Sequence, residues 1–127
     1  MNSKIYGIYH ANNGLIGKLA YSFRKVISRK HCSLCDITHG SLRKKDQWIQ
    51  FIRLSDWPIE LIHLDEQIEE MRIFTDDRTP CVILETEEGY RELLNSRALE
   101  RCKGDVANFI EMLERSLLCT TFNIKGT

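Results

Sequence analysis

The segment from Pro80 to Leu94 constrains the fold of this chain most, because it indicates two strands joined by a tight turn. The apolar run CVILET follows Pro80, and Glu87, Glu88 and Gly89 separate it from a second run that ends at Leu94. Proline is tolerated at the first residue of a strand, and a short connection containing glycine is typical of a hairpin. The segment therefore predicts an antiparallel pair of strands.

Apolar spacing and turn residues locate the other elements. They predict strands at 4–10 and 59–65, helices at 14–30, 42–57, 66–77 and 97–102, and a last helix after Asp105. Asn95 or Ser96 is suited to cap the helix at 97–102, and Asp105 to cap the last one. Ile68 is expected to face the core. The tail from Thr120 is expected to be loose.

This order of elements places the chain in the α/β class. A strand, a crossover helix and a second strand imply a parallel pair, and the hairpin adds antiparallel strands. The 127 residues are enough for one hydrophobic core. The expected fold is therefore a single domain over residues 1–127, with a mixed four-stranded sheet flanked by helices.

Charge and hydropathy argue against two classes of partner. Lysine and arginine number 18, as do aspartate and glutamate, so broad electrostatic capture of nucleic acid is not expected. No apolar run has the length of a membrane span, and the first residues lack a secretory signal pattern, so no membrane partner is expected. The expected location is cytoplasmic. In that reducing compartment, five cysteines are not expected to form a structural disulfide framework.

The stretch HCSLCDITHG, residues 31–40, concentrates the functional question. Its cysteines, Cys32 and Cys35, have the spacing of a redox pair, in which one thiolate attacks a disulfide and the other releases the mixed species. A helix that begins near Cys32 would expose that thiol, half-bury Cys35 and lower the pKa of Cys32. Nearby basic side chains would favour the thiolate further: Arg29, Lys30, His31 and His39.

Zinc binding is an alternative for the same stretch. Cys32, Cys35 and His39 have the ligand-like spacing C-x2-C-x3-H, and His10, after the first strand, could supply a fourth ligand. In that case the chain would be a non-enzymatic interaction module. A third alternative is that both cysteines are inert apolar residues.

Other polar candidates have structural explanations beside the functional ones. Asp36 could accept a proton from Cys35 or cap a helix, and His63 could be a catalyst or a satisfied strand histidine. Cys81 and Cys102 lie among apolar neighbours and are expected in the core, whereas Cys119 is expected to be a free thiol.

From Thr79 onward the chain resembles the thioredoxin-like fold, and in particular the C-terminal half of glutaredoxin-type proteins. The likeness is carried by RTPCVILETEEGYRELLNSRALERCKGDVANFIEMLE, in which Thr79-Pro80 matches the cis-proline turn and GDVANFIEMLE the closing helix. A CxxC followed by a helix is also similar to the DCC family of predicted thiol-disulfide oxidoreductases. Two features differ from the thioredoxin-like pattern: the helix predicted at 14–30 lies before the CxxC, and the intervening pair is Ser33-Leu34.

The resemblance implies an enzyme of thiol-disulfide exchange. Cys32 would be the nucleophile, Cys35 would resolve the mixed disulfide, and Pro80 would lie across from them. The partner would be a protein or small-molecule thiol or disulfide, and no cofactor would be required.

Overall fold

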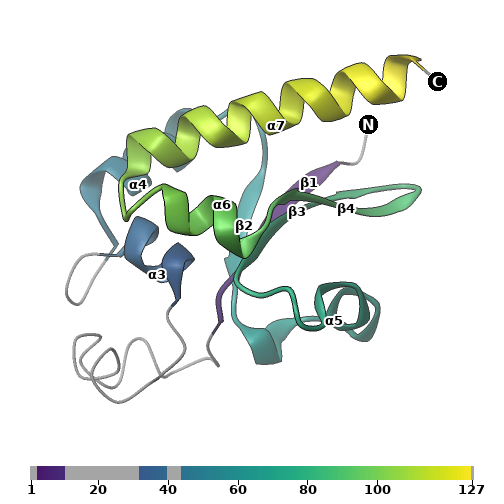
Figure 1. Ribbon diagram of the computed structural model, residues 1–127, viewed down its shortest axis with the longest axis horizontal. Coiled ribbons are helices and arrows are strands. Elements are labelled where there is room, and N and C mark those ends of the chain that lie inside the picture. The colour runs from purple at the N-terminus through teal and green to yellow at the C-terminus, as the bar shows by residue number, and fades with distance from the viewer. Residues whose placement is uncertain (1–2, 11–31, 40–43, 127) are drawn as a thin grey trace.

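A four-stranded mixed sheet forms the centre of the protein, as the computed structural model in Figure 1 shows. The structure describes residues 3–10, 32–39 and 44–126, with side chains to residue 120. The strands are β1 (Lys4–Ile8), β2 (Ile59–Ile62), β3 (Cys81–Thr86) and β4 (Gly89–Leu94), in the spatial order β2-β1-β3-β4. β1 pairs parallel with β2 and antiparallel with β3, and β3 pairs antiparallel with β4. The expected α/β class and mixed sheet are confirmed.

Helices cover both faces of this sheet. They are α3 (Ser33–Thr38), α4 (Asp46–Leu54), the 3-10 helix η1 (Leu64–Glu66), α5 (Glu69–Thr75), α6 (Ser96–Arg101) and α7 (Val106–Gly126). α4 is shorter than the helix predicted at 42–57. The expected loose tail is wrong, because α7 continues to Gly126 and no proline or glycine interrupts it before that residue. The helix predicted at 14–30 lies outside the described residues.

Alternation along β1 divides the core into two apolar clusters. Ile5 and Tyr9 join the larger cluster with residues of α3, α4, α6 and α7. Tyr6 and Ile8 lie on the opposite face, in a smaller cluster that contains Met71 of α5. Figure 1 shows α5 on one side of the sheet, across from α3, α6 and α7, and Leu64 of η1 packs into the same cluster as α5. The sheet is therefore covered on both faces, as its apolar strands require.

Local signals explain several element boundaries. The Asn95 side chain accepts from the Ala98 N–H at the start of α6, and that of Asp105 accepts from the Asn108 N–H at the start of α7. Both caps were expected from the sequence. Ile68 was expected in the core, but it is 60% exposed because it precedes the first turn of α5 and does not share the face of the buried residues.

Gly7 allows the sheet and α3 to approach each other closely. A Cβ atom at this position would lie 2.8 Å from Leu61 Cδ2 and 3.2 Å from Leu34 Cδ2. Leu34 is fully buried and belongs to α3, two residues after Cys32. The absence of a side chain in the middle of β1 therefore sets the height of α3 above the sheet.

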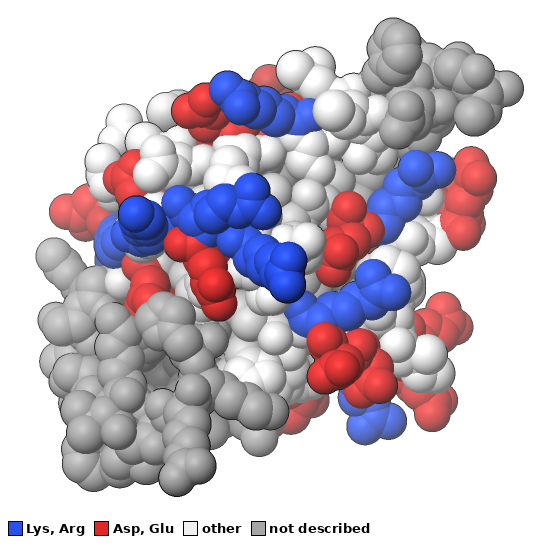
Figure 2. All heavy atoms as spheres, viewed as in Figure 1, with Lys and Arg blue, Asp and Glu red and all other residues white. Residues whose placement is uncertain are grey.

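Basic and acidic side chains are interspersed on the face shown in Figure 2, in keeping with the equal totals of 18 of each kind. Within the described ranges, no helix combines the length and the apolar character needed to cross a membrane.

Candidate functional site

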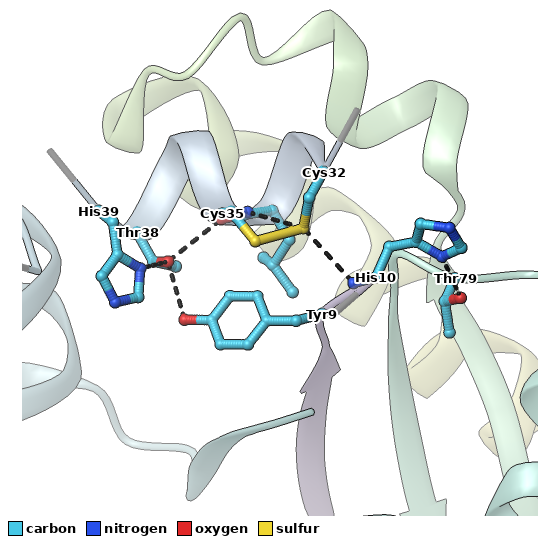
Figure 3. The surroundings of a disulfide bond; sticks show 8 residues. Tyr9, His10, Cys32, Cys35, Thr38, His39 and Thr79 are labelled. Atoms are coloured by element: carbon cyan, nitrogen blue, oxygen red, sulfur yellow. Dashed lines mark hydrogen bonds between the residues drawn. A yellow bond between two sulfur atoms is a disulfide. The ribbon is translucent and has the colours of Figure 1, made fainter. Parts of the chain in front are cut away.

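Cys32 and Cys35 form a disulfide at the start of α3 (Figure 3). Cys32 is the N-cap residue of this helix, a position that the sequence also allowed for Asp36, which lies instead in the first turn. The expected exposure of the two cysteines is wrong. Cys32 is 5% exposed and Cys35 is fully buried, because α3 packs its Leu34 and Ile37 into the core. Cys32 is nevertheless the more accessible of the two residues.

Two backbone N–H groups point at the sulfur of Cys32. The Cys35 N–H donates to Cys32 Sγ over 3.3 Å, and the His10 N–H donates to the same atom over 3.4 Å. The first donor comes from the helix and the second from the chain that leaves β1. Hydrogen bonds to an ionised acceptor are stronger than those to a neutral one, so this arrangement favours a thiolate at Cys32.

The side chain of His10 makes a second connection. Its Nδ1 lies 2.8 Å from Thr79 Oγ1, which belongs to the residue before Pro80 (Figure 3). The Thr79–Pro80 peptide bond is cis, as the resemblance implied. His10, Thr79 and Pro80 all line a pocket of about 530 Å³ between α5 and α6. The Cys32–Cys35 disulfide, the end of β1 and the start of β3 are therefore neighbours.

A buried hydroxyl network lies beside the disulfide. Thr38 Oγ1 donates to the Leu34 carbonyl over 3.2 Å, and it lies 2.9 Å from Tyr9 Oη and 2.8 Å from His39 Nδ1. Because a carbonyl can only accept, the single hydroxyl proton of Thr38 is used in that bond. In the arrangement in which Thr38 donates to that carbonyl, the Tyr9 hydroxyl and the His39 Nδ1–H donate to Thr38, and His39 is the Nδ1–H tautomer.

The charge state of these groups agrees with that assignment. Burial raises the pKa of Tyr9 far above its usual value, so its hydroxyl keeps its proton. Burial, with smaller contributions from Lys44 and His63, lowers the pKa of His39 to about 4. His39 is neutral at pH 7, so the expectation that it supplies positive charge to the thiolate is wrong. Arg29, Lys30 and His31 lie outside the described residues.

The lowered pKa of His39 predicts an acid-sensitive fold. The unfolded chain has a histidine pKa near 6.5 and the folded protein one of about 4, so the unfolded state binds the proton first. The contribution of His39 to the free energy of unfolding should be fully present well above pH 6.5 and fall as the pH drops through 6.5 to 4. The slope should be below about 1.4 kcal/mol per pH unit, because His39 is only half-buried.

Urea unfolding at pH 7.5 and pH 5.5 measures this effect. His39→Gln should lose less stability than the wild type between these pH values, since an amide does not titrate. His63→Gln is the comparison variant and should keep most of the loss, because His63 bonds Glu66 over 2.6 Å and makes only a smaller contribution to the lowered pKa of His39. An equal loss in the wild type and in His39→Gln would contradict the prediction.

The candidate zinc ligands occupy two ends of α3. His10 lies beside Cys32 at the N-terminal end, and His39 caps the C-terminal end (Figure 3). Within the described part of the chain, no group of three or more histidine, cysteine, aspartate or glutamate side chains could hold a metal ion. Zinc would also need both thiols reduced, whereas each histidine could bind through Nε2 and keep the hydroxyl contact of its Nδ1. Zinc binding stays a prediction.

The remaining cysteines and His63 have structural roles or surface positions. Cys81 and Cys102 are fully buried, as expected, and burial raises the pKa of Cys81 to about 12. Cys119 is exposed and unpaired, also as expected. His63 follows β2, and its Nδ1 and backbone N–H both bond Glu66, which closes the turn of η1.

Sequence reasoning missed Tyr9, Thr38 and the side-chain role of Thr79. The polar function of Tyr9 leaves no local signal, because tyrosine in an alternating strand is ordinary core. Thr38 follows Cys35 by three residues and thus lies near it on the helix, which was the one signal available.

A larger hollow, of about 780 Å³, lies between α4 and α7 and is lined by apolar side chains such as Phe51, Trp57 and Ile110. It contains no cysteine or histidine.

Comparisons with protein-family models, curated proteins and solved structures give no match. The function therefore has to be inferred from the geometry of the site.

Proposed function

We propose that this protein is a thiol-disulfide oxidoreductase that uses Cys32 as nucleophile and Cys35 as resolving thiol. The observation that carries this proposal is the Cys32–Cys35 disulfide, in which the sulfur of Cys32 accepts two backbone N–H bonds. A structural cysteine pair in the core needs no such donors. A nucleophile does, because thiolate character determines how readily it attacks.

The reaction begins with the reduced protein. The Cys32 thiolate attacks one sulfur of a substrate disulfide, forms a mixed disulfide and releases the other half of the substrate as a thiolate. Cys35 then loses its proton and attacks Cys32 Sγ, which releases the second substrate thiolate and closes the Cys32–Cys35 bond. Two electrons pass from the protein dithiol to the substrate, and no cofactor is needed.

The small exposed fraction of Cys32 and the burial of Cys35 support this division of roles. A substrate disulfide can reach the residue that has some contact with solvent more readily than the residue that has none. The buried thiol can then react only with the intermediate already attached to its neighbour. Burial of Cys35 also prevents the Cys35 thiol of another protein molecule from attacking the mixed disulfide.

The pocket lined by His10, whose backbone N–H contacts the Cys32 sulfur, suggests where the substrate would lie. Pro80, which the resemblance places across from the cysteines, lines this pocket with His10 and Thr79. We propose a protein or small-molecule disulfide as substrate, and a small-molecule thiol as the reductant that restores the dithiol. The proposed location is the cytoplasm, where such thiols keep the pair cycling.

Mass spectrometry and a turnover assay together test this function. Protein purified without reductant or chelator should have a native mass short by two hydrogens, and peptide mapping should place the bond at Cys32 and Cys35. The same protein should then catalyse the reduction of hydroxyethyl disulfide by glutathione. A mass heavier by one zinc ion would instead support the metal-binding alternative. A reduced, metal-free protein without turnover would reject both.

A further inference from the structure

His10 contacts the redox pair and the Thr79–Pro80 turn at the same time. Its backbone N–H donates to Cys32 Sγ, and its imidazole Nδ1 bonds Thr79 Oγ1. Cys32 lies 22 residues away in the chain and Thr79 lies 69 residues away. One residue therefore joins two distant segments at the sulfur that the proposed reaction uses.

The position of His10 explains why this connection matters. The Tyr9 N–H bonds the Ile62 carbonyl over 2.9 Å, which holds the backbone in the sheet as far as Tyr9. His10 is the next residue, beyond the last residue of β1. The direction of its N–H depends on the backbone torsions at this point, and the bond from its ring to Thr79 restrains them.

We infer that Thr79 and the imidazole of His10 are positioning residues that hold the His10 N–H on the sulfur of Cys32. Their catalytic importance rests on the proposed function, but the contact itself does not. An N–H bond is stronger to a thiolate than to a disulfide sulfur. The pair therefore favours the reduced, ionised state of Cys32 over the Cys32–Cys35 disulfide.

Thr79→Val tests this inference, because valine keeps the shape of threonine but cannot bond His10. The equilibrium between dithiol and disulfide is measured in glutathione buffers, at a pH where Cys32 is ionised. We expect a shift toward the disulfide of roughly tenfold, which corresponds to about 30 mV. The rate of attack on hydroxyethyl disulfide and the alkylation of Cys32 by iodoacetamide at pH 7 should both fall.

Matched variants separate positioning from a general structural effect. Thr79→Ser keeps the hydroxyl and should restore the wild-type equilibrium. Thr86→Val removes a threonine hydroxyl from the β3–β4 hairpin, where it bonds only backbone atoms in the turn, and should leave the equilibrium unchanged. A folded Thr79→Val protein with the wild-type equilibrium overturns the inference.

Substitution of His10 provides a second test in case Thr79→Val does not fold. His10 is only half-buried, so His10→Ala should fold and should give the same shift as Thr79→Val. His10→Asn, whose side chain can still bond Thr79, should give a smaller shift. An unchanged equilibrium in His10→Ala would also overturn the inference. If the wild type lacks turnover but these shifts appear, the proposed function fails and the positioning role stands.

Discussion

Cys32→Ser is expected to reduce the turnover of hydroxyethyl disulfide to the rate measured without protein. A serine hydroxyl is not ionised near neutral pH and does not attack a disulfide, so no mixed disulfide can form. The loss should come without a large change in melting temperature when wild type and variant are compared under reducing conditions, because Sγ and Oγ occupy similar positions. Turnover with glutathione as reductant is the measurement.

Cys35→Ser separates the two roles within the pair. The attack by Cys32 remains possible, but release by Cys35 is lost, so in the absence of glutathione or another thiol the protein should accumulate with one half of the substrate attached. Intact-mass analysis detects this adduct. Cys119→Ser is the matched control, because Cys119 is exposed and outside the site, and its turnover should equal that of the wild type. Turnover that survives in Cys32→Ser would reject the proposed function.

Trp48→Ala is expected to lower the free energy of unfolding by about 3–5 kcal/mol. Trp48 is 1% exposed and is the buried residue of α4. Its ring packs against Phe109 of α7 at a centroid distance of 5.3 Å and against Phe51 at 5.5 Å. Removal of the indole leaves a cavity between two helices that otherwise meet through these rings.

Ile49→Ala is the matched control on the same helix. Ile49 is adjacent to Trp48 but is 43% exposed, so its loss should cost under about 1 kcal/mol. Urea unfolding of both variants at one pH gives the comparison. Equal losses would mean that α4 does not pack on α7 as the structure shows.

The strand pattern of the sheet was predictable because it is local. Residues 4–8 have the alternating pattern of a strand, and residues 81–86 begin with a continuous apolar run. Glu87-Glu88-Gly89 indicates the turn that follows. Gly89 has φ of 126°, a backbone conformation that residues with a side chain rarely adopt, so the turn needs glycine there. The caps at Asn95 and Asp105 were also predictable, since each depends on a side chain and an N–H three residues away.

The candidate site was only partly predictable, because its contacts span long distances in the chain. The CxxC spacing identified Cys32 and Cys35. The bonds of His10 to Cys32 and Thr79, and of Tyr9 to Thr38, join residues separated by 22, 69 and 29 positions. No periodicity encodes such pairs. The neutral state of His39 depends on burial by the assembled fold, which composition and spacing do not reveal.

Gly7 has no functional group, but it affects the geometry of this site. A Cβ atom there would lie 2.8 Å from Leu61 Cδ2 and 3.2 Å from Leu34 Cδ2, so both leucine side chains would have to shift. Leu34 follows Cys32 by two residues, so any displacement of α3 that goes with this shift would move the Cys32 sulfur relative to the His10 N–H. The geometry around the two cysteines thus depends on the missing side chain of a glycine in the strand beneath α3.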